Sequence, residues 1–134
     1  MDEIVELELA RLVIQEKGDS QYIHLRERGG ERTFPIVIGF HEAAEINRKL
    51  HGADTPRPMT HDLLGRVLTT LGWKLGRVVI SELKEHTFYA NLVLQQDGET
   101  REVDCRPSDA IALAVQAHAP IFVARRVLDA VAPA

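Results

Sequence analysis

The sequence predicts a single α+β domain, with a largely antiparallel or mixed sheet and about four helices in the order βββ αα βββ α β α. Several stretches alternate apolar and polar residues, which is the pattern of a strand with one buried face. Other stretches repeat apolar residues every three to four positions, as an amphipathic helix does. Turn signals join consecutive strand-like stretches, which favours antiparallel hairpins. A chain of 134 residues suffices for one ordinary domain, so we assign residues 1–134 to it.

The N-terminal part of the chain is expected to form a three-stranded meander. The predicted strands are residues 5–14, 22–25 and 33–38. A turn signal at residues 17–20 separates the first two strands. Gly29 and Gly30 separate the second from the third, at a position where glycine can supply a positive φ angle.

Two helices are expected next. The first begins after Gly39 and stops at Gly52; its apolar face carries Ala43, Ile46 and Leu50, and its opposite, polar face carries Glu42, Glu45, Arg48 and Lys49. The second runs from Thr60 to a C-terminal glycine at Gly72. It has a wide apolar stripe made of Leu63, Leu64, Val67, Leu68 and Leu71.

The C-terminal half returns to strand patterns and then alternates. Strands are predicted at residues 78–83, 87–94 and 100–104, with Asp97-Gly98 as a hairpin turn before the last of them. A helix is predicted at residues 108–118, a short strand at 120–123 and a last helix near Val127 and Leu128. Strands joined in hairpins, with helices between them, are typical of an α+β domain.

Composition and charge exclude several classes of protein. The formal net charge of −4 argues against a surface covered with basic residues, so any phosphate site must be local. The N-terminus lacks a signal peptide pattern and no stretch approaches about 18 apolar residues, which predicts a cytoplasmic protein without membrane segments. Cys105 is the single cysteine, so one chain cannot form a disulfide or a thiolate metal site. It is either a small buried residue at a strand end or a reactive thiol.

Two short motifs place several polar side chains directly before helical stretches. They are residues 57–62 (RPMTHD) and residues 106–109 (RPSD). In each, proline ends any preceding element, a hydroxyl residue can cap the following helix, and an acid falls in the first turn, where the helix dipole favours it. We expect the two helix starts to form a polar cleft that accepts an anion.

The basic and hydroxyl residues of these motifs are candidates for substrate binding. Arg57 either pairs locally with Asp62 or holds a phosphate through its guanidinium group. Arg106 is its counterpart in the second motif. Thr60 and Ser108 are expected to cap the two helices and to share these N-termini with a bound anion.

The histidine and the acids are candidates for catalysis. His61 can act as a general base, a proton donor or a metal ligand, or it is an ordinary surface residue. The acids offer hard oxygen ligands for a divalent cation if the helix starts converge, or they only complement the helix dipoles. The candidate catalytic residues are His61, Asp62, Asp104 and Asp109.

Two further residues are candidates for the border of the cleft. Glu42 can join the acids around a cation, and Tyr89 either borders the cleft or packs in the core. The sequence contains no zinc-protease motif, no glycine-rich phosphate loop and no nucleophile elbow. The motifs alone therefore predict a cluster of acidic, basic and cationic side chains, but they do not indicate which reaction it would catalyse.

Several separate stretches, in the same order along the chain, resemble the bifunctional nuclease family. They are residues 35–39 (PIVIG), 42–43 (EA), 56–64 (PRPMTHDLL), 87–90 (TFYA), 104–114 (DCRPSDAIALA) and 120–123 (PIFV). The resemblance spans roughly Val5 to Leu128 and implies a compact α+β domain, a homodimer and cleavage of both DNA and RNA. Some relatives carry a further C-terminal UVR motif, which is not expected here. His86 departs from the small or amide residue that relatives tend to have at that turn.

The polar positions shared with the family coincide with the candidates drawn from the motifs. They are Glu42, Arg57, Thr60, His61, Asp62, Tyr89, Asp104, Arg106, Ser108 and Asp109. The leading hypothesis is a nuclease that hydrolyses DNA and RNA with little sequence preference, using Mg²⁺ or Mn²⁺ and no organic cofactor. It predicts that Arg57→Ala and Asp62→Asn abolish cleavage and leave the melting temperature within a few degrees. The alternative is a non-enzymatic dimeric module that binds a small anion, a nucleotide or a protein partner.

Overall fold

The computed structural model describes residues 3–15 and 20–133, and this part of the chain forms seven strands and four helices in the predicted order. The strands are β1 (Ile4–Val13), β2 (Gln21–Glu27), β3 (Thr33–Ile38), β4 (Lys74–Lys84), β5 (Thr87–Gln96), β6 (Glu99–Cys105) and β7 (Ile121–Ala124). The helices are α1 (Phe40–Leu50), α2 (Thr60–Thr70), α3 (Pro107–Ala117) and α4 (Arg125–Val131). The turn predicted at 17–20 lies, except for Ser20, outside the described residues.

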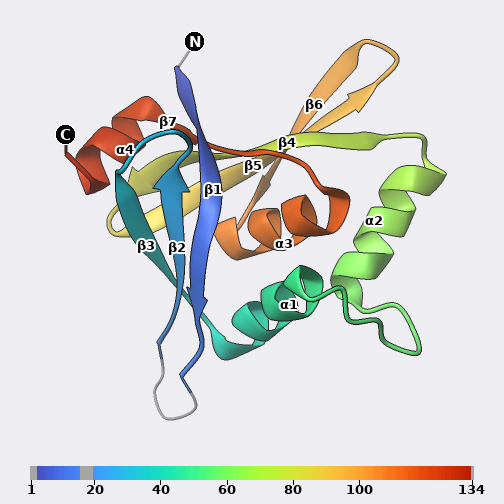
Figure 1. The fold of residues 1–134 in the computed structure, drawn as a ribbon. Coiled ribbons are helices and arrows are strands. Elements are labelled where there is room, and N and C mark those ends of the chain that lie inside the picture. The colour runs from blue at the N-terminus through green and yellow to red at the C-terminus, as the bar shows by residue number, and fades with distance from the viewer. Residues whose placement is uncertain (1–2, 16–19, 134) are drawn as a thin grey trace.

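All seven strands join one mixed sheet in the order β3-β2-β1-β7-β4-β5-β6 (Figure 1). The short strand β7 lies at its centre, antiparallel to β1 and parallel to β4. Every other neighbouring pair is antiparallel. The predicted meander β1-β2-β3, the hairpins β4-β5 and β5-β6, and the α+β class are thus confirmed.

The sheet curls strongly, which brings distant strands together. Five strand spacings separate β3 from β5 in the sheet, and at about 4.8 Å per spacing a flat sheet would place them roughly 24 Å apart. Phe34 of β3 and Phe88 of β5 nevertheless have ring centroids only 5.9 Å apart. The curled sheet therefore encloses one continuous core.

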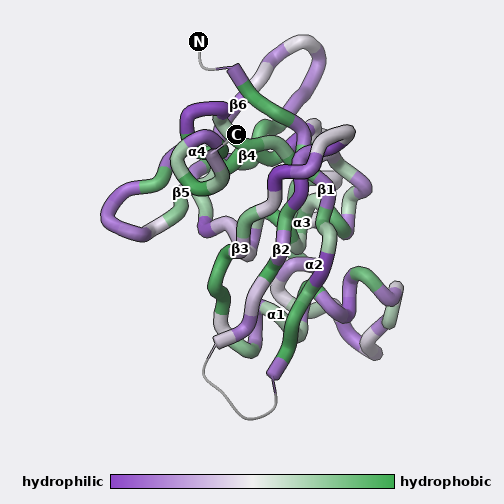
Figure 2. Tube along the Cα trace, turned by 60° about the vertical axis from the view of Figure 1, so that its left-hand side comes forward, coloured by the Kyte–Doolittle hydropathy of each residue, from purple (hydrophilic) through white to green (hydrophobic). Residues whose placement is uncertain are grey.

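Helices α1 and α3 fill the concave side of this sheet. They pack against each other, α1 against β1 and β2, and α3 against β4 and β5 (Figure 1). Figure 2 shows hydrophobic segments concentrated along the strands around α3, while the hairpin turns are largely hydrophilic. Among the described helices, none is long and apolar enough to cross a membrane.

The turns follow the predicted chemistry, with one exception. Gly29 (φ +75°), Gly72 (φ +80°) and Gly98 (φ +82°) all adopt the left-handed conformation that glycine tolerates. The β4-β5 turn instead uses Glu85 (φ 49°) and His86 (φ 66°), two residues that pay a steric cost there. Positive φ angles at both central residues define the type I′ turn, in which asparagine and glycine are favoured.

Both predicted hydroxyl caps are wrong. The residue that caps α2 is Met59 and the residue that caps α3 is Arg106, so Thr60 and Ser108 lie inside the first turn of their helices. At α2 the acid replaces the hydroxyl, because Asp62 Oδ2 accepts a hydrogen bond from the Met59 N–H at 2.9 Å. At α3, proline occupies the first helical position and needs no partner for its nitrogen.

Helix α2 does not bury its apolar stripe. Leu68 packs against the core, but α2 contains no fully buried residue and most of the stripe faces solvent. The exposed fractions are 47% for Met59, 55% for Leu63, 43% for Val67 and 63% for Leu71. These residues recur at every fourth position and form one continuous outer stripe, which we call the α2 stripe.

Candidate functional site

The starts of α2 and α3, which carry the two motifs, lie next to each other. His61 lies in the first turn of α2 and Asp109 in the first turn of α3, and His61 Nε2 is 2.9 Å from Asp109 Oδ1. On the other side of the ring, His61 Nδ1 lies 3.8 Å from Glu45 Oε1 of α1. A largely buried imidazole therefore lies between two carboxylates where three helices meet.

The backbone around His61 is fixed by α3. Gln116 Nε2 donates a hydrogen bond to the His61 carbonyl oxygen at 3.0 Å. The amide reaches this position because Gly65 has no side chain: a Cβ there would lie 2.4 Å from Gln116 Nε2. The glycine thus permits the close packing of α2 on α3 that holds the imidazole in place.

Asp62 joins α1 to α2 and does not pair with Arg57. Its carboxylate accepts hydrogen bonds from Lys49 Nζ and from Arg48 Nη2, the latter at 2.9 Å. Arg48 also pairs with Glu45 at 2.7 Å, so the four side chains form one cluster. The local Arg57–Asp62 pair that the sequence allowed is replaced by pairs with α1.

Arg106 connects α3 to α1 on the other side of His61. Its guanidinium donates to Asp109 Oδ2 at 3.2 Å and to Glu42 Oε1 at 3.3 Å. The Arg106 side chain remains 66% exposed. It can therefore exchange these partners for an anion in solution more readily than the buried Lys49 can.

The cations of this network lower the pKa values of two of its acids, Asp62 and Glu45. The hydrogen bond from Lys49, followed by that from the Met59 N–H, lowers the pKa of Asp62 from 3.8 to about 2. The hydrogen bond from Arg48 lowers the pKa of Glu45. Both carboxylates are thus anions at neutral pH, held beside cations that neutralise them.

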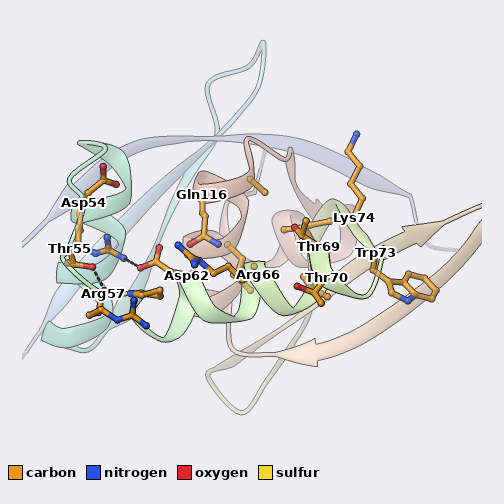
Figure 3. A pocket seen from close by; sticks show the side chains of 18 of the residues that line it. Asp54, Thr55, Arg57, Asp62, Arg66, Thr69, Thr70, Trp73, Lys74 and Gln116 are labelled. Carbon is orange, nitrogen blue, oxygen red and sulfur yellow. Dashed lines mark hydrogen bonds and ion pairs between the residues drawn. The ribbon is translucent and has the colours of Figure 1, made fainter.

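Two cavities flank the network and divide the predicted residues between them. The larger, of about 1170 Å³, lies along α2 and is lined by Arg57 and Asp62 among others (Figure 3). The smaller, of about 440 Å³, lies beside β3 and is lined by Glu42, Arg106 and Ser108. Among the described residues, neither His61 nor Asp109 lines either cavity, and the two arginines do not share one cavity.

Three predicted residues lie apart from the network. Thr60 is exposed at the start of α2. Asp104 is on β6, where it pairs in register with Asn91 of β5. Tyr89 is on β5, 40% exposed, with Lys84 over its ring at 5.7 Å. Neither Asp104 nor Tyr89 lines either cavity among the described residues.

The main residues that sequence reasoning missed lie on the predicted polar face of α1. Glu45 is 9% exposed and the Lys49 side chain 7%, because α2 and α3 cover this face. The signal was present as a charge pattern: Glu45 precedes Arg48 by three residues and Lys49 by four, the spacings of helical ion pairs. The pattern alone does not distinguish a solvated face from one that pairs with another helix.

The acids of the network are poorly suited to hold a divalent cation. Glu42, Glu45, Asp62 and Asp109 each already accept from at least one arginine, lysine or histidine side chain. In the described part of the chain, no group of three or more His, Cys, Asp or Glu side chains is arranged to bind a metal. A cation here would have to displace these partners, so the residues as placed do not fit Mg²⁺ or Mn²⁺.

Cys105 has the properties of a structural residue. It ends β6 and packs partly against the core. Burial, followed by the nearby Asp109 and Asp104 carboxylates, raises the pKa of its thiol to about 12. The thiol therefore stays protonated at neutral pH and is a poor nucleophile.

Comparison with known proteins assigns the family. The sequence model of the bifunctional nuclease domain matches residues 23–133. The chain is 37% identical over 123 residues to the uncharacterized protein Rv1829 of Mycobacterium tuberculosis (strain ATCC 25618 / H37Rv), covering 92% of this chain and 73% of that protein. It is 29% identical over 104 residues to Bifunctional nuclease 1 and 28% identical over 116 residues to Bifunctional nuclease 2, both from Oryza sativa subsp. japonica.

The rice proteins are much longer than the shared region. The alignments cover 75% and 84% of this chain but only 31% and 36% of Bifunctional nuclease 1 and 2. The match therefore concerns about a third of each of those proteins. The family model, which matches residues 23–133, includes both polar motifs and all four helices of the described residues. On these grounds the chain belongs to the bifunctional nuclease domain family.

Proposed function

We propose that this protein is a nuclease that hydrolyses phosphodiester bonds of DNA and RNA with little sequence preference. Its membership of the bifunctional nuclease domain family supports this most strongly. The site that the proposal assigns to the reaction is the junction of α2 and α3, where His61 contacts Asp109. A histidine oriented by a carboxylate is a common arrangement for moving a proton.

Cleavage at phosphorus makes three demands on the site. It needs an activated water, positive charge near the non-bridging oxygens and a proton for the leaving oxygen. In our proposal His61 takes the proton from the attacking water and then gives it to the leaving oxygen, and Asp109 holds the imidazole ring in position. The exposed cations Arg57 and Arg106 line different cavities, so in this proposal they bind different phosphates of the substrate.

The remaining candidates have supporting or untested roles in this proposal. Asp62 acts through its bonds to Lys49 and to the Met59 N–H, which hold the first turn of α2 and hence His61. Ser108 and Thr60 present the helix N-termini to the anion. A catalytic role for Asp104 stays a prediction, as does a need for Mg²⁺ or Mn²⁺, to which no step is assigned.

A cleavage assay with matched histidine variants tests the proposal. Supercoiled plasmid and a structured RNA are incubated with wild type, His61→Gln and His41→Gln, each with Mg²⁺, with Mn²⁺ and with EDTA. His41 is an exposed residue of α1 outside the network, so its variant controls for contamination and handling. Cleavage by wild type and His41→Gln but not by His61→Gln is expected, and equal cleavage by all three would exclude this site.

The second candidate function is a non-enzymatic module that binds a small anion, a nucleotide or a protein partner. The pairing of every network carboxylate with a cationic side chain or with His61 favours it, because such a network also serves purely to join helices. Saturable binding of a nucleotide without turnover of plasmid or RNA would support this module over the nuclease.

We further propose that the protein is a homodimer in the cytoplasm. An unpaired apolar stripe along a whole helix is uncommon on a monomer and fits a self-associating surface. The α2 stripe therefore offers the contact, and the edge strand β3 is the competing surface.

A further inference from the structure

The larger cavity is a groove lined by cations that have no partners. Arg57, Arg66 and Lys74 are exposed, and within the described residues none of their side chains has an ion pair, a hydrogen bond or a ring contact. The cations of the neighbouring network, by contrast, are all paired. A groove lined by unpaired cations is suited to bind an anionic ligand.

The net charge of the groove is positive although that of the protein is negative. Asp54 and Asp62 are the acids that line it, and Asp62 is already neutralised by Lys49 and Arg48. Three free cations therefore face one free carboxylate, in a chain whose formal net charge is −4. The rest of the chain has a net negative charge, so the groove is a local positive region on a negatively charged protein.

The cations are spread along the groove and not gathered around one point. Figure 3 shows Arg57 at one end beside Asp54 and Thr55, Arg66 near the middle beside Asp62, and Lys74 at the other end beside Trp73. Helix α2, which runs between these ends, has 11 residues and is therefore about 16 Å long. A single phosphate cannot contact all three cations, whereas a chain of phosphates can.

An aromatic ring in the groove suits the bases of a nucleic acid. Trp73 lies at the Lys74 end and is partly buried, with the Arg101 guanidinium 5.5 Å from its ring centroid. Stacking on an aromatic ring between cations is how many proteins bind single strands without sequence preference.

We infer that this groove binds single-stranded nucleic acid, with Arg57, Arg66 and Lys74 on successive phosphates and Trp73 against a base. The inference rests on the proposed function in that it names the path by which substrate reaches the His61 junction. Asp62 and Gln116 line the groove and contact the first turn of α2, so a strand in the groove passes beside the turn that carries His61, although the His61 side chain itself does not line the groove.

Trp73 permits a direct test without a label, because it is the only tryptophan in the chain. A single-stranded oligonucleotide is titrated into the protein in EDTA, with intactness checked by gel, and Trp73 fluorescence is followed at several salt concentrations. We expect quenching for wild type and a binding constant that falls linearly with salt on a logarithmic plot. Absence of quenching and of binding by wild type would overturn the inference.

Substitution of the free cations tests their role. One single-strand phosphate contact contributes roughly 0.7 to the salt slope, hence about fivefold in affinity between 1 M and 0.1 M salt. Arg66→Ala/Lys74→Ala should therefore bind about 25-fold more weakly at 0.1 M salt, with a slope lower by about 1.4. The charge-preserving Arg66→Lys/Lys74→Arg should bind nearly as wild type does, which shows that the fold is not the cause.

Arg11 provides the matched control. It is an exposed arginine of β1 that likewise has no side-chain partner among the described residues, but it does not line the groove. Arg11→Ala should bind within twofold of wild type, and a loss equal to that of the double variant would contradict the groove. Inorganic polyphosphate serves as a polyanion without bases, and equal quenching by it would overturn the assignment to nucleic acid.

Cleavage by the same protein preparations separates this inference from the proposed function. If wild type cleaves and the double variant binds and cleaves as wild type does, the groove is not the binding site, but the protein is still a nuclease. If the double variant loses binding but wild type does not cleave, the groove is the binding site and the proposed nuclease activity is wrong.

Discussion

Asp62 has a stabilising role that follows from its three partners. Lys49, Arg48 and the Met59 N–H all donate to its carboxylate, and their combined effect holds its pKa at about 2. The side chain is 24% exposed, so these contacts are only partly screened by solvent. Removing the charge would also leave Lys49, whose side chain is 7% exposed, with only the more distant Glu45 carboxylate at 3.9 Å as a partner.

Asp62→Asn should therefore lower the free energy of unfolding at pH 7, by roughly 2 kcal/mol. Because the folded pKa lies below the unfolded one, the stabilisation is complete above about pH 4 and is lost as the pH falls through about 2. Urea unfolding of both proteins between pH 2 and pH 7 measures this, and the difference should shrink at the acid end. Asp104→Asn, on an exposed strand position, is the control and should show no such convergence.

This expectation differs from the one drawn from the sequence, in which Asp62→Asn would leave the melting temperature within a few degrees. A loss of roughly 2 kcal/mol lowers the melting temperature of a domain of this size by about 4 to 8 °C. The partners of Asp62 lie on α1, 13 and 14 residues away, and local spacing does not reveal a contact between helices. The contact of His61 with Asp109 could not be predicted from local spacing either, because the two residues are 48 positions apart in the sequence.

At the turn of the β4-β5 hairpin, the residue types are poorly suited to the backbone conformation. Glu85 and His86 both occupy the left-handed region, which costs a residue with a Cβ roughly 1 kcal/mol. His86→Gly removes that strain at the second turn position and should raise the free energy of unfolding by roughly 0.5 to 1 kcal/mol. Thermal unfolding measures the change. His51→Gly is the matched control, since His51 has φ −93° and no strain to relieve; an equal gain there would refute the explanation.

Most elements could be predicted because each carries its own signal. Strand β3 begins and ends where the alternation predicted, and α2 ends where Gly72 adopts a positive φ angle. The exposure of the apolar stripe of α2 could not be predicted, because the sequence pattern does not show whether another part of the chain packs against it. The curl of the sheet depends on contacts such as Phe34 with Phe88, which lie far apart in the sequence.

At the level of the assembled molecule, the α2 stripe predicts dimerisation. Leu63→Glu/Leu71→Glu should convert a dimer into a monomer, because charges at two exposed positions of the stripe oppose its burial. Light scattering coupled to size exclusion gives the mass directly. Val37→Glu, an exposed position on the edge strand β3, tests the competing surface: if this variant alone is monomeric, the contact is through β3.

The central claim is that the junction of α2 and α3 carries out chemistry as well as joining helices. Single-turnover cleavage of a single-stranded RNA, measured for wild type and His61→Gln together with their melting temperatures, separates the two roles. A proton-transferring residue predicts a loss of rate of roughly 100-fold or more in a variant that remains fully folded at the assay temperature. A rate that falls only as the folded fraction falls would contradict the claim and leave His61 as a structural residue.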